Sequence, residues 1–226
     1  MLANNLYLTF HGIGDPIVPL AEGEGRYFVG KDVYRQVIAQ LAVLERATGV
    51  KAHVTFDDGN LSDYETGFPA LQEHGRKGSF FVLAGRIGRH GYLSAARIRE
   101  LADAGMEIGS HGHDHVDWRR LDEAGRRREF SDARKRIEDV AGRAVTSAAV
   151  PFGRFDRFVL AHLKQEGFAR VLTSSQGLAM SGSWFCPRTS LTQDFDPARD
   201  LAPLAGASAR LKGVAYAALR KLRYRF

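Results

Sequence analysis

Two aspartates and two histidines are the residues whose types and spacing best fit catalytic chemistry. Asp57 and Asp58 are adjacent, and His111 and His115 are four residues apart. If the second segment formed one helical turn, both imidazoles would lie on one side and could bind the same divalent ion. Adjacent aspartates in an extended segment point to opposite sides, so one could complete the ligand set while the other stays free as a base. These residues predict a site for one divalent metal ion, with zinc favoured by the two histidines and a carboxylate, that activates a water molecule.

Each half of this pattern has an ordinary structural explanation when it stands alone. Histidines four residues apart also occur on exposed helical surfaces, and Asp-Asp-Gly is typical of a turn with a cap. Both halves, however, follow strand-like segments, and functional groups of parallel β/α folds lie at the carboxyl ends of strands. A third segment, Pro151-Phe152-Gly153, also follows such a strand. The coincidence favours the metal site.

Short strands that alternate with helices must position these groups. Runs of apolar and β-branched residues predict the strands, and apolar residues at three-to-four spacing predict the helices. Asp63 and Ser94 are placed to cap two of the helices. The alternation predicts parallel β/α units, arranged as a barrel or as an open sheet. The predicted strands are 6–11, 50–56, 78–85, 106–111, 144–153, 168–174 and one near 184–188, and the predicted helices are 32–47, 64–74, 94–101, 122–141, 155–166 and 211–226.

Thr55-Phe56-Asp57-Asp58-Gly59, followed by Gly109-Ser110-His111-Gly112-X-X-His115, resembles the polysaccharide deacetylase family with its NodB homology domain, carbohydrate esterase family 4. The similarity in motif order and spacing extends from Lys51 to Arg188. The resemblance implies a distorted (β/α) barrel of the NodB type, which we expect to form a single domain over residues 1–205. The charge and apolar pattern predicts that a basic amphipathic C-terminal helix follows it at 206–226. The resemblance also implies metal-dependent hydrolysis of an N- or O-acetyl group on a sugar.

The resemblance further implies a role for each matching residue. Asp57 matches the catalytic base, and Asp58, His111 and His115 match the metal ligands. Val150-Pro151-Phe152-Gly153 matches a motif that lines the substrate groove, where backbone amides would help to bind the oxyanion.

Two positions depart from the family pattern. Ala149 stands where an arginine usually orients the base, and no residue clearly matches the late histidine that protonates the leaving amine. His113, His11 and His53 are candidates for this acid because each lies at or near the end of a predicted strand. His162 lies within a predicted helix, where a structural role is the better interpretation. The catalytic acid is therefore unassigned.

Four further residues have competing interpretations. Arg188 resembles an arginine that many members place after a late strand; it could orient the base, contact a sugar or phosphate oxygen, or form a surface salt bridge. Trp184 could stack on a sugar ring, although core packing is the more ordinary role. Asn60 could touch substrate or stabilise a turn, and Cys186 is expected in buried packing.

The net charge of +6 is concentrated at one end of the sequence. Residues 201–226 contain six basic residues and no acidic one, which leaves 26 basic and 26 acidic residues in 1–200. A neutral body without a recognition module excludes nucleic acid as the expected partner. The segment 211–226 plots as an amphipathic helix. One interpretation packs its apolar face on the barrel with the basic side solvated, and the other attaches it to an anionic membrane surface.

The sequence has no apolar run of the ~18–20 residues that a membrane span needs, no basic leader, and a single cysteine, which excludes an internal disulfide. We therefore expect a cytoplasmic protein, peripheral at the inner membrane face if the helix binds lipid. The leading hypothesis is N-deacetylation of a poly- or oligosaccharide, or of a lipid-linked saccharide, in polysaccharide biosynthesis. The alternatives are a deformylase or O-deacetylase that acts on a glycolipid, and a non-catalytic carbohydrate-binding barrel.

Overall fold

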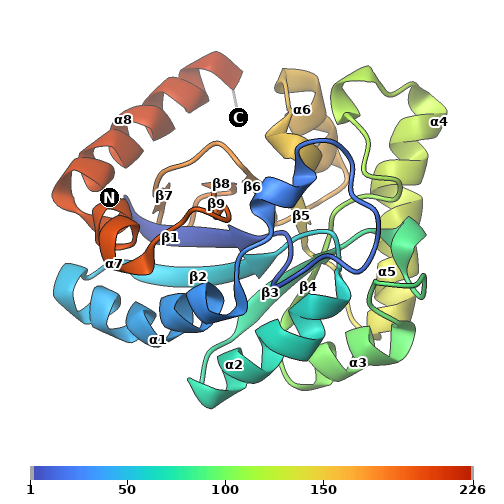
Figure 1. Cartoon of the computed structure of the whole chain (residues 1–226). Helices are drawn as coiled ribbons and strands as arrows, with labels where there is room; N and C mark the ends of the chain where they lie inside the picture. Colours follow the sequence, from blue (N-terminus) through green and yellow to red (C-terminus); the bar gives the residue numbers. More distant parts are fainter. Residues whose placement is uncertain (1–2, 225–226) are drawn as a thin grey trace.

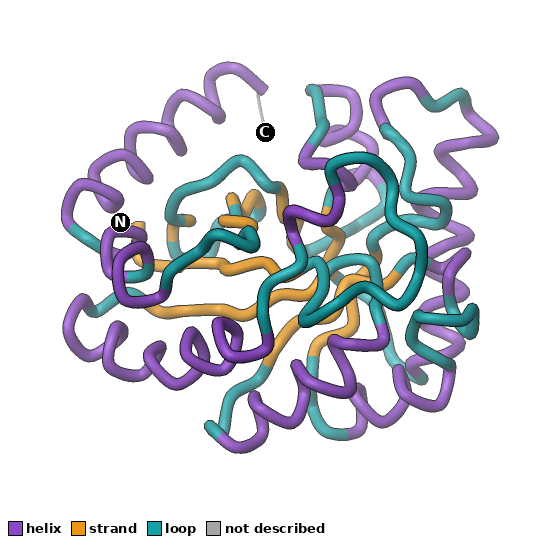
Figure 2. Tube along the Cα trace, viewed as in Figure 1, coloured by secondary structure: helices purple, strands orange, loops and turns teal. Residues whose placement is uncertain are grey.

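Strands form the centre of the molecule and helices surround them (Figures 1 and 2). The structure, a computed structural model, describes residues 3–224. Residues 1–2 of the predicted domain 1–205 and residues 225–226 of the predicted helix 206–226 lie outside the described residues. The strands are β1 Ala3–Phe10, β2 Lys51–Phe56, β3 Gly78–Val82, β4 Glu107–Ser110, β5 Ser147–Ala149, β6 Arg170–Thr173, β7 Ala179–Met180, β8 Phe185–Pro187 and β9 Thr189–Ser190. The helices are α1 Lys31–Thr48, α2 Phe68–Glu73, α3 Ala95–Asp103, α4 Glu123–Arg126, α5 Ala133–Ala141, α6 Arg157–Gln165, α7 Pro197–Asp200 and α8 Ala207–Tyr224.

The strands pair in parallel in the order β1-β2-β3-β4-β5-β6-β8, and β7 adds an antiparallel pairing to β1. β8 pairs with β6, where Leu172 is opposite Cys186, and β9 pairs with β1, where Leu8 is opposite Thr189. Because only Arg188 separates β8 from β9, this one segment joins the two edges of the sheet and closes it. The predicted distorted barrel is therefore confirmed, and the open sheet is wrong.

Apolar side chains fill the space between helices and strands and also the inside of the barrel. Helix α1 buries the apolar stripe predicted for it, including Val37 and Leu41, and each such side chain stabilises the fold by about 1.5–3 kcal/mol. A smaller cluster inside the barrel contains Phe81, Ala149 and Cys186. Cys186 is thus packed as expected, and the position where the family usually has an arginine faces the barrel interior.

The predicted helix 64–74 begins differently from the expectation. Ser94 caps α3 as predicted, by accepting a hydrogen bond from the Arg97 N–H. Asp63, however, caps nothing: it is fully buried at the start of a π-helical turn, Asp63–Gly67, that leads into α2. A Cβ atom on Gly67 would lie 2.8 Å from the Phe56 ring. The glycine therefore lets this turn approach the barrel more closely than a regular capped helix would.

Helix α8 lies along one side of the barrel beside β1 and β7 (Figure 1). The expectation that its apolar face packs on the barrel is wrong, because Leu211 and Leu222 are 74% and 79% exposed. Within residues 3–224, none of the helices combines the length and the apolar character needed to cross a membrane.

Candidate active site

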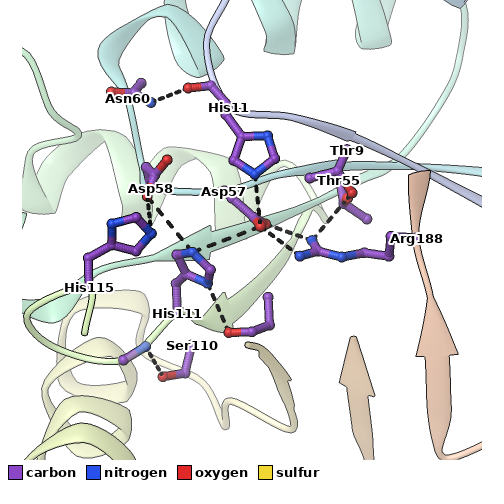
Figure 3. Close-up of polar contacts among 12 residues, drawn as sticks. Thr9, His11, Thr55, Asp57, Asp58, Asn60, Ser110, His111, His115 and Arg188 are labelled. Atoms are coloured by element: carbon purple, nitrogen blue, oxygen red, sulfur yellow. Dashed lines mark hydrogen bonds and ion pairs between the residues drawn. The ribbon is translucent and has the colours of Figure 1, made fainter. Parts of the chain in front are cut away.

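Asp57 and Asp58 follow β2 at the carboxyl edge of the barrel, and their side chains diverge (Figure 3). Asp58 has a φ of 72°, in the left-handed region that Asp and Asn tolerate better than most residues. The chain therefore turns at Asp58 instead of continuing as an extended segment. Asp57 faces Arg188, whereas Asp58 faces His115 (Figure 3). The predicted separation of the two carboxylates is present, but a turn produces it.

Arg188 and Asp57 form a two-point ion pair inside the barrel. The distances are 2.6 Å from Nη1 to Oδ1 and 2.6 Å from Nη2 to Oδ2, and neither side chain is more than 1% exposed. The Thr55 hydroxyl accepts a further hydrogen bond from Arg188 Nη1 and donates one to the Leu8 carbonyl. Of the three interpretations open for Arg188, the surface salt bridge is therefore wrong. Arg188 contacts the aspartate that the absent arginine at position 149 would have oriented.

The ion pair controls the charge of Asp57. Burial alone would raise the pKa of this carboxyl group, but the positive charge of Arg188 outweighs burial. The pKa of Asp57 is therefore well below its ordinary value. Asp57 is ionised near neutral pH, so its proton-accepting form is present there.

Asp58, His111 and His115 bring three ligand atoms within 4.8 Å of one another. Asp58 Oδ1 lies 3.8 Å from His111 Nε2 and 3.4 Å from His115 Nε2. This oxygen is buried and has no hydrogen-bond partner, a state that costs free energy unless a cation compensates it. Two imidazoles and one carboxylate, with room for a fourth ligand, match catalytic zinc sites. The three residues therefore fit a divalent ion.

The hydrogen bonds and the burial of these ligands favour metal binding. His111 Nδ1 lies 2.8 Å from the Ala149 carbonyl oxygen, which can only accept, so Nδ1 carries the proton and Nε2 presents its lone pair. Burial lowers the pKa of His111 to about 3 and that of His115 to about 4, which keeps both rings neutral. Burial, with the charge of Asp57 adding to it, raises the pKa of Asp58 to about 6.

A loop, rather than the predicted helical turn, holds His111 and His115 together. The loop bends at Gly112, where φ is 87°, and at His115, where φ is 58°. Glu129 is buried beneath it and accepts hydrogen bonds from the Trp118 indole and from the backbone N–H groups of the two residues before His115. Sequence reasoning missed Glu129 because a buried acid in a charged helical segment has the same pattern as an exposed one.

A cavity of about 250 Å³ opens over two of the three metal-site residues, Asp58 and His115. The segment between β1 and α1, the long blue loop in Figure 1, supplies one wall, which includes Glu24 and Tyr27. Aromatic faces and a few polar groups on a concave surface suit a sugar ring and its substituents. Sequence reasoning also missed Arg86, which follows β3 and has Nη1 3.6 Å from Asp58 Oδ1; its place after a strand was the available signal. The cavity is lined by His11, Leu20, Glu24, Tyr27, Phe28, Asp58, Asn60, Arg86, Tyr92, His115, Phe152, Arg154, Ser174 and Ser190.

The three candidate acids, His11, His113 and His53, all lie in the described part of the chain. Of these three, only His11 lines the cavity. Its Nε2 is 3.8 Å from Asp57 Oδ2, and its buried Nδ1 has no hydrogen-bond partner. The His113 ring instead pairs with Asp114, with 2.7 Å between Nδ1 and Oδ1. His53 lies within β2 and stacks on a tyrosine of β1. The structure therefore brings His11, and neither of the other two, to the cavity.

The third motif, Val150-Pro151-Phe152-Gly153, offers fewer free backbone N–H groups to an oxyanion than the resemblance implied. Pro151 has no N–H group, and the Gly153 N–H donates to the Val150 carbonyl at 3.1 Å. Phe152 is left as the candidate donor to an oxyanion. Its φ of 58° is unusual for a bulky residue, its ring lies 4.3 Å from that of His115, and its side chain is 49% exposed in the cavity wall.

The structure does not bring two of the remaining candidates to the cavity. Trp184 precedes β8, at the opposite end of that strand from Arg188, and its indole donates to the Phe168 carbonyl at 2.7 Å. His162 bonds to a carbonyl of its own helix, as its structural interpretation implied. Asn60 does line the cavity, and its amide donates to the His11 carbonyl at 2.6 Å, which stabilises the turn after Asp58.

Comparison with known proteins identifies the family of the chain. The family model for polysaccharide deacetylases matches residues 45–171. YxkH from Bacillus subtilis, assigned to the polysaccharide deacetylases by name, is 28% identical over 126 residues, which are 56% of this chain and 45% of YxkH. The chain thus spans less than half the length of this curated relative.

Two solved structures share the fold. The deacetylase PplD from Streptococcus pyogenes, in complex with acetate, has a TM-score of 0.77 at 18% identity, over 90% of this chain and 99% of PplD. IcaB from Ammonifex degensii has a TM-score of 0.73 at 24% identity, over 90% of this chain and 97% of IcaB. The family match covers more than half of the 226 residues and includes both aspartates and both histidines. On this match, and with the barrel fold in agreement, the chain belongs to the polysaccharide deacetylase family.

Proposed function

We propose that the chain is a metal-dependent carbohydrate deacetylase that hydrolyses the N-acetyl amide of a poly- or oligosaccharide. One observation carries the proposal: an ionised aspartate, fixed by a buried arginine, lies beside a His₂-Asp cluster, two of whose members, Asp58 and His115, line a cavity. A barrel that only bound carbohydrate would have no need of this arrangement, because burying charged groups costs free energy.

Asp57 acts as the general base. Its Oδ2 lies 3.9 Å from His111 Nε2, one of the metal-ligand atoms. The carboxylate is therefore next to the position that a metal-activated water would occupy. A divalent ion held by Asp58, His111 and His115 would lower the pKa of that water and polarise the acyl carbonyl. Asp57 accepts the proton of the attacking water. The two-point contact with Arg188 fixes the orientation of the Asp57 carboxylate during this proton transfer.

His11 donates a proton to the leaving nitrogen. Burial lowers the pKa of His11, although the charges of Asp57 and Asp58 oppose this shift. The lowered pKa makes the imidazolium a stronger acid but a less populated one near neutral pH. The Phe152 N–H is the remaining backbone donor of the motif for the developing oxyanion, and a donor fixed in place beforehand needs little reorganisation during the reaction.

Acetate release from N-acetylglucosamine oligomers by the zinc-loaded protein tests the proposal, with formylated and O-acetylated sugars as alternative substrates. Asp57→Asn should retain zinc and lose about 10²–10⁴-fold in rate, because it removes the base and no metal ligand. Asp103→Asn is the matched control, since Asp103 is 69% exposed on α3. Circular dichroism verifies that each variant is folded. An Asp57→Asn variant that is folded and fully active would refute the assigned role.

A further inference from the structure

Helix α8 presents a row of apolar residues to solvent. Leu211, Ala215, Ala218 and Leu222 are spaced by four, three and four residues, which places them on one face. All four are exposed, with the two leucines 74% and 79% accessible. Leu219, 59% exposed, widens the row. An apolar stripe on the outer face of a helix is the reverse of the usual arrangement, in which the stripe faces the core.

Contacts on the opposite face fix this orientation. Gly213 is buried, and a Cβ atom there would lie 2.8 Å from Ala3 Cβ and 3.0 Å from the Leu178 carbonyl oxygen. Gly213 and Leu222 are nine residues apart, which at about 100° per residue puts them on opposite sides of the helix. Arg220 also donates to the carbonyls of Ser175 and the residue after it. The helix cannot rotate its apolar row inward without losing these contacts.

Basic side chains flank the apolar row on both sides. At about 100° per residue, Lys212 and Arg223 lie on one side of the row, and Arg210 and Lys221 lie on the other. Residues 207–224 contain no acidic residue. Long basic side chains can lay their stems along apolar surface while their charges reach outward.

We propose that this outer face of α8 is a docking surface for an anionic membrane. A bilayer surface would bury the leucines in its interfacial region and pair the flanking charges with lipid phosphates. A second copy of the chain is a poorer partner, because two such helices would place basic residues against basic residues with no acid to compensate them. The charge pattern therefore selects the lipid surface.

The inner face of α8 contacts a segment next to the cavity wall. Ser174 and Ser190 line that cavity, and the carbonyl of the next residue, Ser175, accepts the hydrogen bond from Arg220 of α8. The inner face of α8, opposite the docking surface, is thus hydrogen-bonded to the loop that continues from the cavity wall. The docking proposal itself is independent of the chemistry proposed for the cavity.

Co-sedimentation of the full chain with vesicles tests the proposal. We expect binding to vesicles of phosphatidylcholine and phosphatidylglycerol in equal parts, and none to phosphatidylcholine alone. Leu211→Glu/Leu222→Glu should abolish binding, whereas Val43→Glu, a change on α1 at a position 58% exposed, should not. Lys212→Gln and Lys221→Gln should each weaken binding about fivefold, and added salt should weaken it further.

Three outcomes would overturn the proposal. The first is that the wild type does not bind vesicles, and the second is that the leucine variant binds them as fully as the wild type. The third is a wild-type dimer in analytical ultracentrifugation that the leucine variant disrupts, with no binding of the wild type to vesicles. Zinc content and acetate release from soluble oligomers, measured on the same preparations, should equal those of the wild type. These two readouts distinguish failure of the docking surface from failure of the proposed deacetylase function, because α8 contributes nothing to the metal-site residues.

Discussion

Replacing Asp57 or Asp58 by asparagine should change the stability of the metal-free protein in opposite directions. The two residues are neighbours in sequence, both are buried, and the substitution is the same. They differ in their partners: Asp57 forms a two-point ion pair with Arg188 at 2.6 Å, whereas Asp58 Oδ1 makes no hydrogen bond and lies 3.6 Å from Arg86 Nη1. The pair of variants therefore isolates the effect of the partner from the effect of burial.

The free energy for Asp58 follows from its pKa. Burial, with help from Asp57, raises this pKa from 3.8 to about 6. The folded state thus holds the proton more tightly than the unfolded state, so the stability it contributes is full below pH ~4 and is lost as the pH rises through about 6. At pH 8 the ionised side chain costs about 3 kcal/mol. Asn removes this cost and suits the left-handed backbone, so Asp58→Asn should raise Tm by about 6–12 °C.

For Asp57 the sign is the opposite. Its pKa is lowered in the folded state because Arg188 outweighs burial, so its stabilising contribution is present above pH ~4 and is lost as the pH falls further. Asp57→Asn leaves the Arg188 guanidinium at 0% exposure without its partner. Breaking a buried pair in this way costs about 3–5 kcal/mol.

Thermal unfolding after removal of metal by a chelator measures both effects, at pH 8 and again near pH 5. Asp103→Asn serves as the exposed control and should leave Tm unchanged. The stabilisation by Asp58→Asn should shrink at the lower pH, and the destabilisation by Asp57→Asn should persist. A metal-free Asp58→Asn protein that is less stable than the wild type at pH 8 would refute the reasoning about the buried Asp58 carboxylate.

Three further predictions concern the catalytic groups. Arg188→Lys keeps the charge but loses the two-point contact with Asp57, so acetate release should fall about 10–100-fold at unchanged zinc content; an unaltered rate would contradict the orienting role. His11→Gln should lower kcat about 10²–10⁴-fold without loss of zinc, and zinc loss in that variant would instead make His11 a ligand. Zinc affinity, measured by isothermal titration calorimetry, should fall about tenfold per pH unit below pH ~6, because protons compete for the Asp58 carboxylate whose pKa is raised to about 6; a pH-independent affinity would exclude Asp58 as a ligand.

The barrel and the ligand cluster could be predicted because their signals are local. Short apolar runs that end in polar residues indicate parallel strands, and Asp57, Asp58 and His111 each stand directly after such a run. Carboxyl ends of neighbouring strands meet at one edge, so these groups had to lie close together. His11 also follows a strand, but that signal did not separate it from His113 and His53.

The remaining features depend on contacts between segments far apart in sequence. Arg188 reaches Asp57 because β8 and β9 close the barrel on either side of it, and no local pattern encodes that closure. The loop at Gly112 depends on buried Glu129, whose sequence context is typical of a solvated helix. Trp184 has the kind of side chain that stacks on sugar rings, but it precedes β8, at the opposite end of that strand from Arg188. The division at residue 205 and a cytoplasmic location stay predictions.

Zinc content per chain, measured by plasma mass spectrometry on the wild type and on His115→Ala, tests the central claim most directly, because it requires no knowledge of the substrate. His115 contributes one of the three clustered ligand atoms, with Nε2 3.4 Å from Asp58 Oδ1. We expect about one ion in the wild type and little in the variant. Absence of metal from the wild type after reconstitution, or equal metal in both proteins, would contradict the proposed metal site and with it the proposed hydrolysis.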